Sequence, residues 1–138
     1  MVPTLDPAKV VFACVANAGR SQMAAAFFNA LVDPTRAYAV SAGTRPAANV
    51  HPEVVTAMQE AGIDLSDATP QYLSTDVCKD AHILITMGCG DECPLIPGLE
   101  RDDWPLDDPK GQPLERVRQI RDEIKKCVEG LVRERKWR

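Results

Sequence analysis

The chain has 138 residues, of which 45% are hydrophobic and 5% aromatic, and its formal net charge is −4. These values predict one compact domain, residues 1–138, with an aliphatic core, and they exclude an intrinsically disordered chain. No apolar run reaches the ~20 residues of a membrane span, and the N-terminus lacks the basic-then-apolar order of a signal peptide. We therefore expect a cytoplasmic, monomeric protein without membrane association, in which residues 1–8 form a loosely ordered tail.

The charge is unevenly distributed along the chain. Residues 115–138 hold nine Lys and Arg against five Asp and Glu, a local charge of +4, which leaves −8 for residues 1–114. Apolar residues recur at helical spacing through the basic segment: Leu114, Val117, Ile120, Ile124, Cys127, Val128 and Leu131. The charges then lie on the opposite helix face, which favours a solvated helix over a nucleic-acid-binding tail, and we expect no nucleic acid as a partner.

The first predicted elements are a strand, a tight loop and a helix. Residues 10–15 form a short apolar, β-branched run, which is typical of a strand buried on both faces of a parallel sheet. A glycine-containing loop follows. From Ser21 the apolar residues take helical spacing, and this pattern stops at Asp33 and Pro34.

The same alternation continues along the chain. Residues 38–42 predict a second strand, Pro52 and Gly62 bracket a helix, and residues 81–87 predict a third strand. Residues 88–113 are rich in glycine and proline and predict irregular structure before the long C-terminal helix. Strands that alternate with helices indicate an α/β fold, a three-layer sandwich with a parallel sheet.

The first loop carries the clearest chemical signal. Cys14 lies where the strand ends, and Arg20 follows after five intervening residues, where the helix begins. Backbone N–H groups in such a loop can surround a tetrahedral anion, and a guanidinium can bind two of its oxygens. We call residues 14–21 the oxyanion loop. Its predicted substrate-binding residues are Val15, Ala16, Asn17, Ala18, Gly19, Arg20 and Ser21.

Cys14 is the predicted nucleophile of this loop. The helix N-terminus stabilises a thiolate, and the Ser21 hydroxyl can donate a hydrogen bond to the sulfur. Gly19 allows tight turning, and Asn17 is one of the few residue types that tolerate positive φ. The alternative is a buried cysteine at a strand end beside a helix-capping serine, but the placement between strand and helix favours the catalytic interpretation.

At this point the sequence resembles the low-molecular-weight protein tyrosine phosphatase superfamily, and within it the arsenate reductases. The resemblance covers nearly the whole chain, and four stretches carry it: residues 14–23, 41–44, 86–94 and 104–109. The resemblance implies a four-stranded parallel sheet flanked by helices. It also implies that the aspartate of an Asp-Pro pair, matched here by Asp108, is the general acid. Without the resemblance, the sequence would indicate only a solvated acidic loop formed by Asp102, Asp103, Asp107 and Asp108. Asp107 is the weaker candidate for the general acid.

Three features favour arsenate reduction over phosphate-ester hydrolysis. Gln22 and Met23 follow Ser21, as in the arsenate reductases that the chain resembles, where the phosphatases usually have proline. Lys110 and Gly111 follow the Asp-Pro pair, where the phosphatases usually place aromatic residues. The third feature is a pair of cysteines after the third strand, Cys89 and Cys93, which could supply the two electrons that reduction needs. The thioredoxin-coupled reductases carry further redox cysteines there, although with wider spacing.

The five cysteines leave one alternative at this segment. In a reducing compartment they indicate catalytic, redox or buried roles rather than a disulfide framework. Cys78, His82, Cys89 and Cys93 could ligate a metal, but the first two flank the start of the third strand while the pair follows its end. We therefore expect no metal, and we expect structural roles for Cys78 and Cys127.

The expected reaction is thiol-dependent reduction of arsenate, for which phosphate and sulfate are mimics. Arsenate is attacked by Cys14, and the adduct is resolved by a small thiol such as mycothiol or by Cys89 and Cys93. No cofactor is expected to be bound; the reductant is external, and mycothiol, glutaredoxin with glutathione, or thioredoxin fits. Residues 17–26 resemble the corresponding segment of the enzymes that use mycothiol. Ala25 stands where the thioredoxin-coupled reductases usually have glutamate, which favours a thiol from solution. The alternatives are a low-molecular-weight protein tyrosine phosphatase and a non-catalytic oxyanion-binding or regulatory protein.

Overall fold

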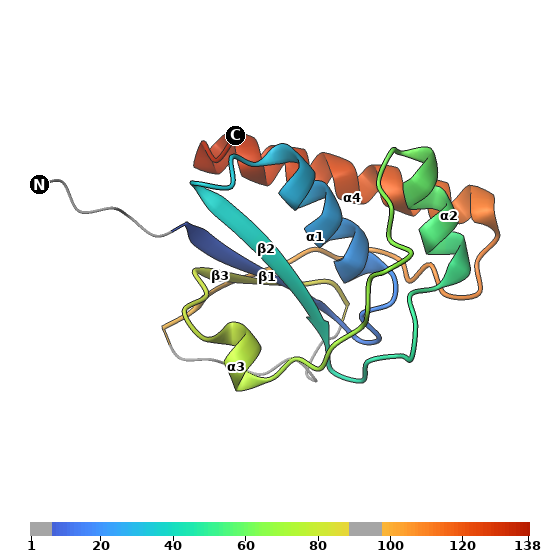
Figure 1. Ribbon diagram of the computed structural model, residues 1–138, viewed down its shortest axis with the longest axis horizontal. Helices are drawn as coiled ribbons and strands as arrows, with labels where there is room; N and C mark the ends of the chain where they lie inside the picture. The colour runs from blue at the N-terminus through green and yellow to red at the C-terminus, as the bar shows by residue number, and fades with distance from the viewer. Residues whose placement is uncertain (1–6, 89–97) are drawn as a thin grey trace, which may run out of the picture.

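The computed structural model describes residues 7–88 and 98–138, which form eight helices and strands (Figure 1). In chain order they are β1 (Ala8–Cys14), α1 (Arg20–Leu31), β2 (Ala37–Gly43), α2 (Pro52–Glu60), α3 (Thr75–Cys78), β3 (Ile83–Thr86), β4 (Glu100–Asp103) and α4 (Leu114–Arg135). Among these helices, none is long and apolar enough to cross a membrane.

The four strands form one parallel sheet in the order β2-β1-β3-β4. In β1, Ala8 pairs with Ala37 and Cys14 pairs with Gly43, so the carboxyl ends of β1 and β2 meet at the same edge. Ligands bind at this edge in open α/β sheets, because the loops that leave the strands converge there. The predicted four-stranded parallel α/β fold is thereby confirmed.

Side chains of β1 alternate between two apolar layers, as the pleat of a strand requires. Val10, Phe12 and Cys14 face the core beneath α1, α2 and α4, whereas Val11 and Ala13 face a smaller cluster with Cys78 of α3. Figure 1 shows α1, α2 and α4 on one side of the sheet and α3 on the other. The larger core holds the rings of Phe12 and Phe28, whose centroids are 5.9 Å apart.

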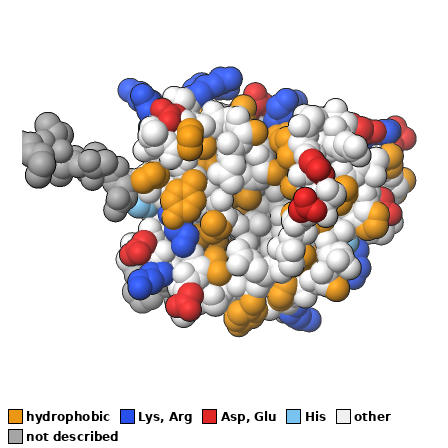
Figure 2. Space-filling model, viewed as in Figure 1, with side chains coloured by type: hydrophobic (Ala, Val, Ile, Leu, Met, Phe, Trp, Pro, Cys, Tyr) orange, Lys and Arg blue, Asp and Glu red, His pale blue; other side chains and the backbone are white. Residues whose placement is uncertain are grey.

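The C-terminal helix α4 has the predicted amphipathic character. Five residues of the predicted apolar face are buried in the larger core: Val117, Ile120, Ile124, Val128 and Leu131. Lys and Arg side chains gather along the margin of the molecule over this helix (Figure 2). The helix ends at Lys136, which has a left-handed backbone with φ of 59°, a common way of ending a helix.

The structure gives strand bounds that differ by one or two residues from the predicted ones. Residues 1–6 of the predicted tail lie outside the described part of the chain; Ala8 already belongs to β1, and its N–H donates to the carbonyl of Arg36 at 2.9 Å. The segment 88–113 was expected to be irregular, yet it contains β4. The sequence of this edge strand is Glu-Arg-Asp-Asp, and all four residues are exposed. It therefore lacks the apolar pattern by which a strand is predicted, and its pairing with β3 holds it in the sheet.

Candidate functional site

The oxyanion loop joins the end of β1 to the start of α1 at the carboxyl edge of the sheet. Cys14 is the last residue of β1 and is buried, and Arg20 is the first residue of α1. The N–H of Met23 donates to the carbonyl of Gly19 at 3.0 Å, which starts the hydrogen bonding of the helix directly after the loop. The helix N-terminus therefore faces the ring of the loop with its free N–H groups.

The carbonyl groups of the loop are occupied on its outer side. Segment 44–51, which follows β2, donates four backbone hydrogen bonds of 2.8–3.2 Å to them: Thr44 to Cys14, Arg45 to Val15, Ala47 to Ala16 and His51 to Ala18. Because the N–H and C=O of a peptide unit point in opposite directions, this arrangement turns loop N–H groups toward the concave side. Segment 44–51 thus fixes the positions of the peptide units in the loop.

Gly43 allows segment 44–51 to come this close. A Cβ atom at Gly43 would lie 2.5 Å from the carbonyl oxygen of Val15 and 2.8 Å from the nitrogen of Asn17. Both neighbours are backbone atoms and cannot move aside like a flexible side chain. A residue with a side chain here would therefore push the oxyanion loop away from β2.

Asn17 connects the loop to its surroundings. Its φ is 49°, in the left-handed region expected for it, and it is fully buried. Its Oδ1 accepts hydrogen bonds from the backbone N–H of Gln71 at 2.9 Å and from Nε2 of Gln22 at 3.2 Å, while its Nδ2 donates to Ser21 Oγ at 2.7 Å. Every polar atom of the amide is engaged, which fixes its orientation.

The hydrogen bond from Asn17 to Ser21 determines the direction of the hydrogen bond between Ser21 and Cys14. Ser21 Oγ lies 2.8 Å from Cys14 Sγ, and either atom could be the donor. A hydroxyl has a single hydrogen, and Ser21 Oγ already accepts from the amide of Asn17, which can only donate through Nδ2. The serine proton is therefore free to point at the sulfur of Cys14.

Arg20 lies beside the loop with its guanidinium largely buried. The side chain is 8% exposed, and one terminal nitrogen, Nη1, donates to the carbonyl of Leu106 at 3.2 Å. Its Nε is buried without a hydrogen-bond partner among the described residues. A buried donor without a partner is costly, and a bound oxyanion would satisfy it.

Gly88 is a second glycine on which the site depends. Its φ is +91°, and a Cβ atom there would overlap Nη1 of Arg20. The chain after β3 therefore passes directly against the guanidinium and leaves no space for a side chain. Residue-based reasoning missed this role, because Gly88 and Arg20 are far apart in the sequence.

The structure separates the two candidate aspartates. Asp108 Oδ2 lies 3.6 Å from Nη2 of Arg20, and Asp108 Oδ1 accepts from the N–H of Lys110 at 3.0 Å. Asp107 instead pairs with Arg116 on α4 and is directed away from Arg20. Of the two, Asp108 is thus the aspartate that lies at the oxyanion loop, and it is half-exposed.

Pro109 places this aspartate over the loop. A Cβ atom at Gly19 would lie only 2.7 Å from Cγ of Pro109. Gly19 itself has φ of −144° and ψ of −93°, a backbone conformation that suits glycine, and it also makes room for the Asp-Pro segment. The contact brings together residues that the sequence separates by almost ninety positions.

The remaining candidate residues lie elsewhere or outside the described residues. Cys78 is buried in the α3 cluster, and burial raises the pKa of its thiol; burial also raises the pKa of Cys127 on α4. His82 accepts a hydrogen bond from the N–H of Lys9 at 3.0 Å. Within residues 7–88 and 98–138, no group of His, Cys, Asp and Glu could hold a metal. Cys89 and Cys93 lie outside the described residues.

Comparison with known proteins identifies the family to which this site belongs. Residues 9–136 match the family described as low molecular weight phosphotyrosine protein phosphatase. The chain therefore belongs to this family. A relative from Halobacterium salinarum, named "Putative arsenate reductase", is 44% identical over 129 residues, 89% of each chain. An arsenate reductase of Staphylococcus aureus is 33% identical and aligns over 88% of this chain and 94% of its own length.

Solved structures agree with this relationship. A thioredoxin-dependent arsenate reductase of Corynebacterium glutamicum superposes with a TM-score of 0.80 at 37% identity; the match covers 94% of this chain but 62% of the longer relative. An arsenate reductase in the phosphate binding state has a TM-score of 0.80 at 34% identity, covering 92% of this chain and 98% of that one. An arginine phosphatase of Geobacillus stearothermophilus, at 23% identity and a TM-score of 0.76, shares the fold.

Proposed function

We propose that this protein is an arsenate reductase. The observation that carries the proposal is the grouping of Cys14, Arg20 and Asp108 around one loop: a thiol held by a serine hydroxyl, a buried guanidinium with an unsatisfied donor, and a carboxyl group. This grouping suits attack on a tetrahedral oxyanion. Relatives that are at least 30% identical and named arsenate reductases support arsenic as the central atom.

The first chemical step forms a bond between sulfur and arsenic. Arsenate binds to the loop N–H groups and to Arg20, and the Cys14 thiolate attacks the arsenic atom. One oxygen leaves as water after it accepts a proton from Asp108. Oxyanion binding occupies the Arg20 donors, which releases the Asp108 carboxyl from its ion pair and lets it turn toward the leaving oxygen.

The second step moves two electrons to arsenic. A second thiolate attacks Cys14 Sγ, a disulfide forms, and the sulfur–arsenic bond breaks with its electron pair remaining on arsenic. Arsenic(V) becomes arsenic(III), which leaves as arsenite. The disulfide is then reduced by an external thiol system, so the protein needs no bound redox cofactor for this sequence of steps.

The source of the second thiol is the finer part of the proposal. Ala25 favours a thiol from solution, whereas the similarity to a thioredoxin-dependent reductase supports a relay through Cys89 and Cys93. We give the relay priority for turnover with thioredoxin, since that relative is 37% identical across 94% of this chain, and assign turnover with mycothiol or glutaredoxin-linked thiols to the solution route. The aligned part makes up 62% of the length of that relative. Thioredoxin as the reductant of this chain is therefore part of the proposal.

A specific observation keeps phosphatase activity as the second candidate. The loop, Arg20 and Asp108 would equally serve hydrolysis of a phosphate ester through a phosphocysteine. A phosphotyrosine phosphatase would also need an aromatic wall beside the cysteine. Trp104, the aromatic residue nearest the Asp-Pro segment in sequence, instead packs against Phe12 with ring centroids 5.5 Å apart.

One paired assay tests the proposal. Arsenate reduction is measured with thioredoxin, glutaredoxin with glutathione, and mycothiol systems, and hydrolysis of p-nitrophenyl phosphate is measured in parallel. We expect thiol-dependent arsenite formation that exceeds ester hydrolysis and that Cys14→Ser abolishes. Ester hydrolysis without arsenate reduction would assign the chain to the phosphatases, and no turnover in any system would indicate an oxyanion-binding protein.

A further inference from the structure

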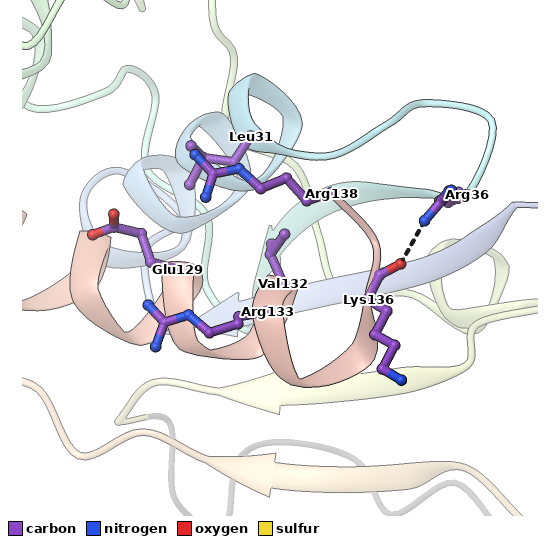
Figure 3. Close-up of a pocket in the computed structure, with 7 residues that line it drawn as sticks. All are labelled: Leu31, Arg36, Glu129, Val132, Arg133, Lys136 and Arg138. Atoms are coloured by element: carbon purple, nitrogen blue, oxygen red, sulfur yellow. Dashed lines mark hydrogen bonds between the residues drawn. The ribbon is translucent and has the colours of Figure 1, made fainter.

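A cavity of about 230 Å³ lies at the opposite end of the molecule from the oxyanion loop. It is lined by Leu31, Arg36, Glu129, Val132, Arg133, Lys136 and Arg138 (Figure 3). Arg36 precedes the first residue of β2, whereas Cys14 pairs with the last one. The strand between them spans roughly 20 Å, so the cavity is separate from the catalytic site.

The walls of the cavity are held together by hydrogen bonds between distant parts of the chain. The N–H of Asp33 donates to the carbonyl of Trp137 at 2.8 Å, and the Arg36 guanidinium donates to the carbonyl of Lys136 at 3.0 Å. The Trp137 ring packs against Phe28 with centroids 5.7 Å apart. These contacts fix the end of α4 against the loop between α1 and β2, and the cavity is therefore preformed.

The lining combines strong positive charge with an apolar base. The lining includes four cationic side chains and one carboxylate side chain, that of Glu129, although the net charge of the protein is −4. Arg36 is also paired with Asp33 at 3.6 Å. In residues 7–88 and 98–138, the side chains of Arg133, Lys136 and Arg138 have no hydrogen bond or ion pair.

Val132 supplies the apolar base, together with Leu31 at the end of α1. Val132 is 2% exposed, and Leu31 is half-buried. In the view of Figure 3, Arg138 lies beside Leu31, whereas Arg36 and Lys136 lie on the other side of Val132. The cationic groups are thus spread around the apolar residues instead of forming a single cluster.

We propose that this cavity binds a small organic dianion whose two carboxylate or phosphate groups contact the cationic rim while a short hydrocarbon part or ring contacts Leu31 and Val132. Arginine favours both kinds of group because its planar fork binds two oxygens at once. The volume lies below the ~300–1,000 Å³ typical of drug-sized ligands, which limits the occupant to a small molecule.

Three probes separate the requirements of the site: isophthalate has a ring and two carboxylates, benzoate has a ring and one, and glutarate has two carboxylates without a ring. Binding to the full chain is measured by calorimetry and by amide NMR shifts. We expect isophthalate to bind most tightly, with shifts in residues 31–36 and 129–138, and we expect added salt to weaken it. Shifts confined to residues 15–20, or no saturable binding, would overturn the proposal.

A matched pair of variants tests whether the cavity, rather than general charge, is responsible. Arg133→Gln/Arg138→Gln removes two exposed cavity cations, and Lys125→Gln/Lys126→Gln removes two exposed cations elsewhere on α4. We expect isophthalate affinity to fall about tenfold in the first variant only, with arsenate reduction unchanged in both. Equal losses in both would overturn the proposal, as would tight binding of a 20-mer single-stranded DNA without binding of any dicarboxylate.

Discussion

In the proposed mechanism, the reactivity of Cys14 depends on two uncharged neighbours. Ser21 supplies the hydrogen bond to sulfur, and Asn17 determines which way that bond runs. Charged groups are not required for this, because a neutral hydroxyl stabilises an anion if its proton cannot point elsewhere. Gln22 and Gln71 in turn hold the Asn17 amide in place. The hydrogen-bond network therefore extends from the sulfur to the segment before α3.

We expect Ser21→Ala to slow alkylation of Cys14 by iodoacetamide at pH 6.5 by tenfold or more. A hydrogen bond to a charged group contributes about 1.5–3 kcal/mol, and this one is lost completely. Asn17→Ala leaves the hydroxyl in place but lets it rotate, so its effect should be smaller. Alkylation rates measured against pH for both variants check this order; a larger effect of Asn17→Ala would contradict the assigned direction of the bond.

The two neighbouring aspartates should differ sharply on mutation. Asp108→Asn should slow formation of the sulfur–arsenic bond by ~10²-fold, the scale expected for loss of a general acid. Asp107→Asn removes a carboxylate that pairs with Arg116 and should change this step little. Single-turnover kinetics measure the step directly. If Asp107→Asn were the more damaging change, the roles within the pair would have to be exchanged.

At the scale of elements, the oxyanion loop is shaped by contacts with segments that follow other strands. The segment after β2 holds its carbonyl groups, and the turn after β3 lies against Arg20. Two glycines, Gly43 and Gly88, make these approaches possible. Such contacts position the reactive groups within the small tolerance that catalysis requires.

Gly88→Ala tests the contact between the β3 turn and the guanidinium. The new methyl group would overlap Arg20 Nη1 and displace it, so we expect the KM for arsenate to rise roughly tenfold or more. Gly98→Ala is the matched control, because Gly98 also has positive φ, +80°, but none of the described residues lies within 4 Å of a new Cβ there. Both variants carry the backbone strain of roughly 1–2 kcal/mol. Equal KM values would show that the overlap does not matter.

Glu60 links α2 to α4 and should make stability depend on pH. Its hydrogen bond to Arg118 lowers the pKa of the carboxyl below its ordinary value. A lowered folded-state pKa stabilises the fold above the unfolded value, roughly 4.3, and this stabilisation is lost as pH falls through the folded value. We therefore expect Glu60→Gln to lower the melting temperature slightly at pH 7, with the difference from wild type vanishing near pH 3.

A melting-temperature series from pH 7 to pH 3 checks this link. Glu134→Gln on the exposed face of α4 is the control, because its carboxylate has no hydrogen bond or ion pair among the described residues. A difference between wild type and Glu60→Gln that stays constant over the whole range would mean that the Glu60 charge plays no part.

At the scale of the whole molecule, local features were predictable and long-range contacts were not. Cys14, Arg20 and the intervening residues could be identified because strand, loop and helix follow each other directly. Asp108 could be selected only through the family resemblance, because four aspartates lie within seven residues and the contact with Arg20 spans almost ninety positions. The exposed strand β4 gives no apolar pattern, and only its pairing with β3 reveals it.

The proposed relay needs a second thiol from a part of the chain beyond the oxyanion loop. Cys78 is buried in the α3 cluster with a raised pKa, which makes it a poor nucleophile at neutral pH. Cys127 also has a raised pKa and lies on α4. Neither is therefore suited to attack the Cys14 adduct, which is consistent with the proposed relay through Cys89 and Cys93.

Cys89→Ser/Cys93→Ser separates the two possible sources of the second thiol, since both routes share Cys14, Arg20 and Asp108. In the relay, one of the pair attacks Cys14 and the two then form a disulfide, which three intervening residues permit if the Cα atoms come within ~7 Å. We expect the variant to lose thioredoxin-linked turnover and to keep substantial arsenate reduction with mycothiol or glutaredoxin-linked thiols. Phosphate binding, measured by calorimetry, should be unchanged and shows that the loop is intact. Full thioredoxin-linked activity in this variant would rule out the relay, and inactivity with every thiol would make the pair obligatory.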